Sequence, residues 1–402
     1  MSSMASLGPF KGSAFEVLII FLKLGLTSFG GPIAHIGYFR QELVARRQWL
    51  NESQFSQLLA ISQFLPGPAS SQLGFALGLL RAGWLGALAA FIGFTLPSVL
   101  LLLGFVSLLP WMSADIGGLA IHGLKLVACA VVADAVIGMF KKLCPDLMRR
   151  GIALLVLAIL ILVNSAWTQI GVVLLGAVAG LFLLRESAAS SRDVIQVRYG
   201  KRIGLLLFAI FCVLLLLLLP QYTQADGLTT IASTFYQAGA MVFGGGHVVL
   251  PLLEQSVVAN GWVSNESFLA GYGASQAIPG PMFAFAAYLG ALIPGDFHPW
   301  LGAMVALLFM FLPGFLLMTA AIPLWQTISQ NALAANAIAG VNAAVVGILA
   351  AALYDPIFTS GLTSITDILI VLVAFLMLAK WKLSSLLVVL WCVLTSVLLG
   401  FI

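Results

Sequence analysis

The motif Ser-Gln-x-x-Pro-Gly-Pro occurs twice in this chain, at residues 62–68 and again at residues 275–281. Pro-Gly-Pro cannot continue an α-helix, because proline has no amide hydrogen to donate and its ring clashes with the preceding turn. A Phe-Gly-Gly break precedes each copy, at 29–31 and 243–245. Two kinds of break in the same order predict that the chain contains two copies of one folding unit.

The sequence around these breaks is too apolar for a water-soluble fold. Hydrophobic residues make up 61% of the 402 residues and charged residues only 8%, whereas a soluble domain carries about 25% charged residues. Long apolar runs with so few charges are typical of helices that cross a lipid bilayer. We therefore expect an all-α polytopic membrane protein whose surroundings are the lipid bilayer, and no binding of nucleic acid.

Further matches support an internal duplication. A Leu-Pro pair follows the breaks in both halves, at 96–97 and 312–313, each within a long apolar run. Chance or shared composition would explain one such match but not the whole ordered set. The organisation that we predict has three parts: an N-terminal repeat at 1–184, a basic cytoplasmic linker with a connecting span at 185–227, and a C-terminal repeat at 228–402.

The basic residues predict that the two repeats are inverted relative to each other. Cytoplasmic loops of membrane proteins carry an excess of Lys and Arg, and the N-terminal half has basic clusters at 141–150 and 185–202. No Lys or Arg occurs from 203 to 379. The next two, Lys380 and Lys382, fall in the late turn that an inverted second repeat would place in the cytoplasm.

The broken segments of the first repeat, 13–40 and 54–80, have cytoplasmic signals at both ends. Each arm has only about 12 residues, too short to cross a hydrocarbon core of about 30 Å at about 1.5 Å per residue. We therefore expect each repeat to contain two broken re-entrant helical hairpins, followed by about four transmembrane helices. Kinked helices that cross the membrane completely are the alternative.

The breaks also predict a binding site. Non-helical backbone at membrane depth must be buried in protein or line a polar cavity, because lipid cannot satisfy its hydrogen bonds. The helix N-termini that follow such breaks attract anions, and inverted-repeat transporters assemble their substrate sites from broken helices. The residues that we expect to bind a small anion are Ser28, Gly30, Gly31, Gln63, Gly67, Ser70 and Ser71 in the first repeat and Gly244, Gly245, Gly246, Gln276 and Gly280 in the second.

Ionisable residues inside apolar segments are functional candidates by default. Lys23 precedes the first break and Lys125 lies in a later span, so either could supply positive charge to an anion site. His247 follows the second Phe-Gly-Gly and could bind the anion or carry a proton, and Glu254 is a second candidate for proton coupling. The alternative for Lys23 is that it pairs with Glu16 or reaches the membrane surface. Small residues at the breaks could likewise serve only helix packing.

Several other chemistries leave no trace in the sequence. A Walker A motif is absent, so we expect no ATP-driven step. The four cysteines, at 129, 144, 212 and 392, are scattered without a neighbouring His, which argues against a structural zinc site or a disulfide framework. The sequence shows no paired nucleophile and base of the kind that would suggest an enzyme. We expect no cofactor and no metal ligand, and the sequence leaves the oligomeric state open, a homodimer being one state that it allows.

Four segments resemble the chromate ion transporter family. They are FLKLGLTSFGGPIAHIGYFR (21–40), FLPGPASSQLGFALG (64–78), FGGGHVVLPLLE (243–254) and QAIPGPMFAFAAYLGA (276–291). The resemblance covers both halves and identifies the chain as a long-chain, two-domain member. Halves in opposite orientation are an expectation of this family too, in agreement with the distribution of Lys and Arg.

The resemblance implies a function. It implies export of chromate from the bacterial cytoplasm across the inner (plasma) membrane by secondary active transport, and with it chromate resistance. Chromate and sulfate are near-identical tetrahedral dianions, so a sulfate-like oxyanion is an equally compatible substrate. A passive anion channel, or a transporter for a different small anion, remains the alternative.

Overall fold

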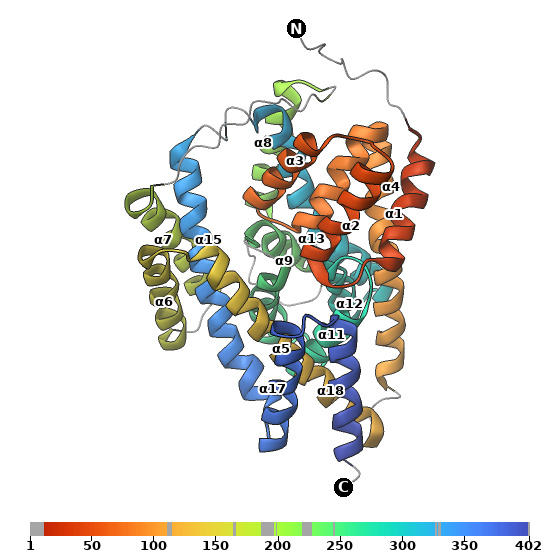
Figure 1. Ribbon diagram of the computed structural model, residues 1–402, viewed down its shortest axis with the longest axis vertical. Helices are drawn as coiled ribbons and strands as arrows, with labels where there is room; N and C mark the ends of the chain where they lie inside the picture. Colours follow the sequence, from red (N-terminus) through yellow and green to blue (C-terminus); the bar gives the residue numbers. More distant parts are fainter. Residues whose placement is uncertain are drawn as a thin grey trace.

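The computed structural model describes residues 12–110, 115–163, 166–185, 197, 199–218, 227–243, 246–325, 328 and 331–400, and every regular element in these ranges is a helix. Figure 1 shows the N-terminal helices together at one end and the C-terminal helix α18 (Ser385–Leu399) at the other. The prediction of an all-α protein is confirmed.

The N-terminal half contains two broken segments followed by longer helices. Its elements are α1 (Ala14–Thr27), α2 (Gly31–Phe39), the π-helix η1 (Arg40–Arg46), α3 (Glu52–Phe64), α4 (Ala69–Leu108), α5 (Asp115–Leu143), α6 (Leu147–Leu162) and α7 (Ala166–Leu183). Helix α8 (Lys201–Leu217) connects this half to the next. Helix α4 kinks at Ala82 and Gly83, whose backbone torsions are not helical.

The C-terminal half repeats this order. Its elements are α9 (Leu228–Met241), η3 (Gly246–Val248), α10 (Val249–Leu253), the π-helix η4 (Glu254–Val258), α11 (Asn265–Ala277), η5 (Met282–Ala284), α12 (Phe285–Leu292), α13 (Pro299–Ala321), η6 (Ile322–Leu324), α15 (Ala332–Ala352), η7 (Leu353–Phe358), α16 (Thr359–Gly361), α17 (Ile365–Ala379) and α18. A π-helix follows the Phe-Gly-Gly break in both halves, so the duplication extends to an irregular element.

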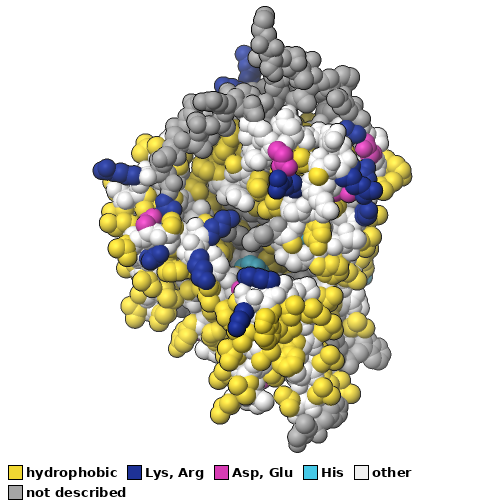
Figure 2. Space-filling model, viewed as in Figure 1, with side chains coloured by type: hydrophobic (Ala, Val, Ile, Leu, Met, Phe, Trp, Pro, Cys, Tyr) yellow, Lys and Arg dark blue, Asp and Glu magenta, His cyan; other side chains and the backbone are white. Residues whose placement is uncertain are grey.

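Four helical segments are long and apolar enough to cross a membrane: Ala69–Leu108, Ile116–Leu143, Pro299–Leu324 and Ala332–Gly361. Large apolar side chains such as Leu85, Phe182 and Ile365 are 70%, 82% and 79% exposed, which would be costly in water and is expected in lipid. Figure 2 shows extensive hydrophobic surface, with Lys and Arg side chains spread over the face in view. The chain is therefore a multi-pass membrane protein.

Each half packs one long helix against the last two helices of the other half. Helix α5 contacts α17 and α18, and α15 contacts α6 and α7 (Figure 1). Small residues permit these contacts: a Cβ on Gly123 of α5 would lie 2.7 Å from the Cα of Val393, and one on Gly340 of α15 would lie 2.7 Å from the Cα of Gly180. Backbones that approach this closely are typical of helix packing in membranes.

A group of charged residues joins the ends of the broken segments in the N-terminal half. Arg81, just before the kink in α4, forms an ion pair with Glu16 at 3.0 Å, and its guanidinium lies 5.0 Å from the ring centre of Trp49. Arg40 pairs with Glu52 at 3.0 Å. The start of α1 and the kink in α4 are thereby held to the segment between η1 and α3, and the start of η1 is held to the start of α3.

Candidate functional site

The first break lies between α1 and α2. Helix α1 ends at Thr27, and Gly30 and Gly31 follow with φ angles of 97° and 76°. These left-handed conformations favour glycine, because a Cβ would be strained there. Pro32 then lies in the first turn of α2, where its missing amide hydrogen costs nothing.

The Pro-Gly-Pro tip of each half is hydrogen-bonded to the Phe-Gly-Gly break of the other half. The amide of Gly67 donates to the carbonyl of Val242 at 2.7 Å, and the amide of Gly280 donates to the carbonyl of Ser28 at 2.9 Å. Ser28 and Val242 each directly precede Phe-Gly-Gly. The same pair of positions therefore joins the two halves twice, in opposite directions along the sequence.

Residues that follow the two Leu-Pro pairs support these crossed contacts. Ser98 donates its hydroxyl to the carbonyl of Pro279 at 2.7 Å. On the other side, Nε2 of Gln72 donates to the carbonyls of Pro66 at 2.8 Å and Gly314 at 3.0 Å. Ser98 and Gly314 occupy equivalent positions in the repeats. The four breaks thus meet through backbone atoms and two polar side chains.

Glycine is required at both tips by conformation and by space. Gly67 and Gly280 have φ angles of 118° and 92°. A Cβ on Gly67 would lie 3.0 Å from the Cα of Gly314, and one on Gly280 would overlap Oγ of Ser98. Their amides already bond to carbonyls, so the amides that stay available for an anion are those of the helix N-termini beside them.

A group of buried polar side chains lies around the first-half breaks. Ser28 and His35 are fully buried, and Nδ1 of His35 lies 3.4 Å from Oγ of Ser70 in the first turn of α4. The His35 ring packs edge-on against Phe94 of α4, with centroids 5.2 Å apart. Among the described residues, buried side-chain atoms without a hydrogen-bond partner include Oγ of Ser28, Nε2 of His35, Oγ of Ser71, Oε1 of Gln72 and Oγ1 of Thr95.

The structure brings some of the predicted site residues together and leaves others apart. Ser28, Gly67 and Gly280 take part in the crossed contacts, and Ser70 lies beside His35. Lys23 and Gln63 are exposed, and Nε2 of Gln276 contacts Oγ of Ser275 and the sulfur of Met282. Gly246 opens η3, whereas Gly244 and Gly245 lie outside the described residues.

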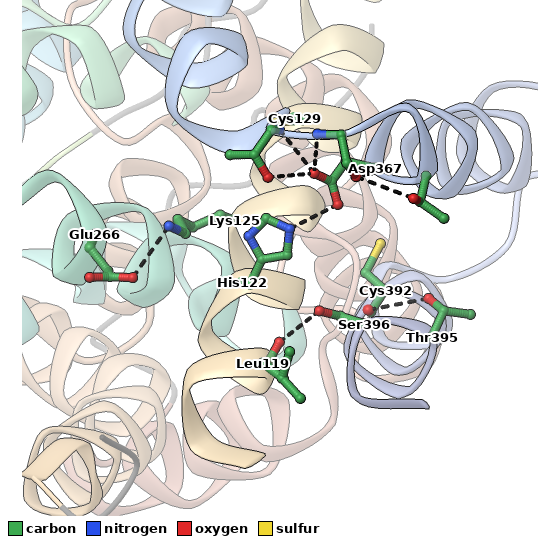
Figure 3. A network of polar contacts seen from close by, with 12 residues as sticks. Leu119, His122, Lys125, Cys129, Glu266, Asp367, Cys392, Thr395 and Ser396 are labelled. Atoms are coloured by element: carbon green, nitrogen blue, oxygen red, sulfur yellow. Dashed lines mark hydrogen bonds and ion pairs between the residues drawn. The ribbon is translucent and has the colours of Figure 1, made fainter. Parts of the chain in front are cut away.

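Lys125 belongs to a separate polar network between the halves (Figure 3). Its ammonium lies 3.3 Å from the carboxylate of Glu266 at the start of α11. One turn earlier on α5, Nε2 of His122 contacts Oδ1 of Asp367 at 2.8 Å, and Oδ2 of Asp367 accepts hydrogen bonds from the backbone at the start of α17. The charges of this network are paired, which favours a role in joining α5 to α11 and α17.

The two predicted proton carriers lie in different surroundings. Nδ1 of His247 contacts the hydroxyl of Tyr272 at 2.6 Å. Glu254 lines a cavity of about 80 Å³ together with Asp355 and Gln169. Two carboxyl groups at one cavity could share a proton. Among the described residues, no three His, Cys, Asp or Glu side chains lie close enough to hold a metal ion.

Sequence reasoning missed Thr95 and Ser98. Both lie next to the repeated Leu-Pro pair, and that pair was the signal that could have found them. A proline within a helix often marks a place where another element approaches, because it leaves a carbonyl free. The sequence does not show, however, that this place faces the Pro-Gly-Pro tip of the other half.

Comparison with known proteins agrees with these observations. The family model described as "Chromate transporter" matches residues 15–181 and 229–401. A "Probable chromate transport protein" of Synechococcus elongatus is 33% identical over 374 residues, which cover 91% of this chain and 89% of the relative. The "Chromate transport protein" of Pseudomonas aeruginosa is 29% identical over 341 residues, which cover 83% of this chain and 79% of the relative.

An archaeal relative is also similar. An uncharacterized transporter of Methanocaldococcus jannaschii is 26% identical over 397 residues, which cover 97% of this chain and 94% of the relative. No solved structure matches. The family model covers most of both halves, and the crossed breaks lie within the two matched ranges, so this chain belongs to the chromate transporter family.

Proposed function

We propose that this protein is a secondary active transporter that exports chromate, or a sulfate-like oxyanion, from the bacterial cytoplasm across the inner membrane and thereby confers chromate resistance. Membership of the family and the names of the two bacterial relatives support chromate as the substrate. The proposed resistance requires outward transport, because chromate harms a cell less only when it is removed from the cytoplasm.

The observation that carries the proposal is the pair of crossed hydrogen bonds between the breaks, Gly67 to Val242 and Gly280 to Ser28. Transporters built from inverted repeats place their substrate site where broken helices of the two repeats meet. Helix N-termini at such a place attract anions and need no fixed cation. The crossing of four breaks is the feature expected of an oxyanion pathway.

The contacts of the broken segments support re-entrant hairpins. In the N-terminal half, Arg81 contacts both Glu16 and Trp49, so the ends of both broken segments lie close together. In the C-terminal half, the hydroxyl of Tyr288 on α12 donates to the carbonyl of Ser267 at the start of α11 at 2.7 Å. A helix that crossed the membrane with only a kink would separate such ends. We therefore propose hairpins in two inverted domains, 1–184 and 228–402, joined by the basic segment at 185–227.

The reciprocal packing of helices between the halves supports a two-fold relation between them, and the distribution of Lys and Arg is what supports an inverted one. Helices α5 and α15 each pack against the final pair of helices in the other half, which is the reciprocity that a two-fold relation produces. We further propose His247 and Glu254 as proton carriers for coupling. The other predicted site residues, Lys23 and Lys125 among them, and a homodimer stay predictions.

The proposal is tested by chromate accumulation in energised inverted membrane vesicles, with and without this protein. Active export predicts accumulation that depends on the protein, collapses on addition of an uncoupler and falls when excess sulfate competes. Flux that only follows the electrochemical gradient, without saturation, would show a passive channel instead. If vesicles with folded, inserted protein accumulate no chromate, the proposed substrate is wrong.

A further inference from the structure

The two halves share a backbone plan at the breaks but differ in the polarity of equivalent side chains. Ser28 and Val242 both precede Phe-Gly-Gly, and His35 and Val249 both lie four residues after it. Three residues beyond Pro-Gly-Pro, Ser71 in the first half corresponds to Ala284 in the second; two residues before the Leu-Pro proline, Thr95 corresponds to Phe311. At all four positions the first half has a hydrogen-bonding side chain and the second half has an apolar one.

These polar side chains are buried without the partners that buried polar groups normally have. Ser28 and His35 are 0% exposed, Thr95 is 2% and Ser71 is 4% exposed. The hydroxyls of Ser28, Ser71 and Thr95 and Nε2 of His35 have no hydrogen-bond partner among the described residues. Leaving several such groups unpaired destabilises a protein, so a concentration of them points to a polar ligand.

The polar groups lie around one place in the structure. The Ser28 carbonyl accepts from Gly280, and the backbone of Ser28 also makes a polar contact with the His35 ring. His35 in turn contacts Ser70 in the first turn of α4, next to Ser71. Thr95 lies one helical turn before Ser98, which bonds to the carbonyl beside Gly280, and residues at this spacing share a helix face. The first break, the first turn of α4 and the later part of α4 thus lie next to one another.

Polar side chains near the breaks of the second half, by contrast, are satisfied within the protein. His247 bonds to Tyr272, and the hydroxyl of Ser275 donates to the carbonyl of Tyr272. Thr319, a buried threonine of α13, donates its hydroxyl to the carbonyl of Phe315 in its own helix. Among the described residues around the crossed breaks, the unpaired groups belong to the first half.

We propose that one tetrahedral oxyanion binds on the first-half side of the crossed breaks, to the hydroxyls of Ser28, Ser71 and Thr95 and to Nε2 of His35, while Val242, Val249, Ala284 and Phe311 line the opposite, apolar side. This inference rests on the proposed function and deepens it. The N-terminus of α4 adds the partial positive charge of its free amides. Such a site holds the dianion by neutral donors, and it takes chromate and sulfate alike because both accept hydrogen bonds through all four oxygens.

The test measures anion binding to the purified full chain in detergent, by the shift of its thermal unfolding midpoint as sodium chromate or sodium sulfate is titrated. The variant is Thr95→Val, which keeps the shape of the side chain and removes its hydroxyl. The matched control is Thr319→Val, which removes a hydroxyl that already has a partner. We expect Thr95→Val to weaken binding of both anions roughly tenfold, and Thr319→Val to bind as the wild type does.

Stability without ligand separates a binding role from a structural one. Thr95→Val removes a buried hydroxyl that has no partner among the described residues, so its ligand-free unfolding midpoint should be equal to or higher than that of the wild type. Should Thr95→Val fail to fold, Ser71→Ala serves as the second variant, with the same loss of binding expected. Wild-type affinity for chromate and sulfate in the folded variant would overturn the site.

The failure of this site and the failure of the proposed function give different results. If the wild type binds chromate in detergent and Thr95→Val does not, but vesicles accumulate no chromate, the site stands and active export is wrong. If vesicles accumulate chromate and Thr95→Val transports and binds normally, export stands and the site is wrong. If the wild type binds neither anion, the site is wrong.

Discussion

At the residue scale, the structure separates glycines and polar groups that shape the crossed breaks from charged groups that hold helices together. Gly67 and Gly280 are needed for their positive φ angles and for close backbone approach. His122 on α5 contacts Asp367 at the start of α17, and neither residue belongs to a break. Because the two kinds of residue have different tasks, substitutions should affect transport and stability separately.

Asp367→Ala should destabilise the protein strongly. The Asp367 side chain is only 7% exposed and accepts hydrogen bonds from the amides of Thr363 and Ser364 as well as contacting His122. Losing a buried, multiply bonded carboxylate costs about 3 kcal/mol. The control, Asp146→Ala, removes a half-exposed cap at the start of α6 and should cost about 1 kcal/mol. Unfolding in detergent measures both, and equal losses would contradict a special role for the Asp367 network.

At the element scale, the breaks could be predicted from the sequence, but their meeting could not. Pro-Gly-Pro and Phe-Gly-Gly end helices wherever they occur, so the bounds of α1, α3, α9 and α11 follow from local chemistry. The bond from Gly67 to Val242 joins residues far apart in the sequence, and no local propensity encodes it. Nor did the sequence show that α4 continues through its kink.

The same contrast holds within the candidate site. Ser28, Gly67, Ser70 and Gly280 could be chosen because they adjoin a visible break. The only sequence signal for Thr95 is the repeated Leu-Pro pair beside it, and its burial without a partner among the described residues is seen only in the structure. Lys23 is a candidate because of its charge, but its side chain is exposed on α1, as are those of Leu22 and Leu26.

The packing of α15 against α7 depends on Gly340. A Cβ at this position would lie 2.7 Å from the Cα of Gly180, so Gly340→Val should force the helices apart and cost about 2 kcal/mol. At Gly171, also on α7, a Cβ would meet open space, and Gly171→Val should change stability by less than about 0.5 kcal/mol. Detergent unfolding of both variants is the measurement. A tolerant Gly340→Val would mean that the close contact is not needed.

At the scale of the whole molecule, each of two halves of similar plan packs its last two helices against the other half, and the two halves meet at their breaks. Helix α5 of the first half packs against α17 and α18, and α15 of the second half packs against α6 and α7, so neither half is complete without the other. Among the described residues at the breaks, the buried polar side chains that have no hydrogen-bond partner nevertheless belong to the first half. The duplication therefore supplies a similar backbone plan in both halves, and the side chains make the two sides of the proposed anion pathway different.

The inverted arrangement predicts opposite accessibility of equivalent residues. Ala45 and Ala259 both lie fourteen residues after the second glycine of Phe-Gly-Gly, and both are exposed. A membrane-impermeant maleimide should label Ala45→Cys from the cytoplasmic side and Ala259→Cys from the outer side. The unmodified chain, whose described cysteines are buried or half-buried, gives the background. Labelling of both variants from one side would contradict inverted repeats.

The most direct test of the account is the initial rate of chromate uptake by inverted vesicles that contain Gly67→Ala or Gly280→Ala. Alanine at either tip is strained by the positive φ and collides with the partner half, so each variant should lose most of its uptake, by roughly tenfold or more. Gly138→Ala on α5, where a Cβ meets open space, should keep the wild-type rate. Equal rates in all three variants, at equal amounts of folded protein, would contradict an oxyanion pathway through the crossed breaks.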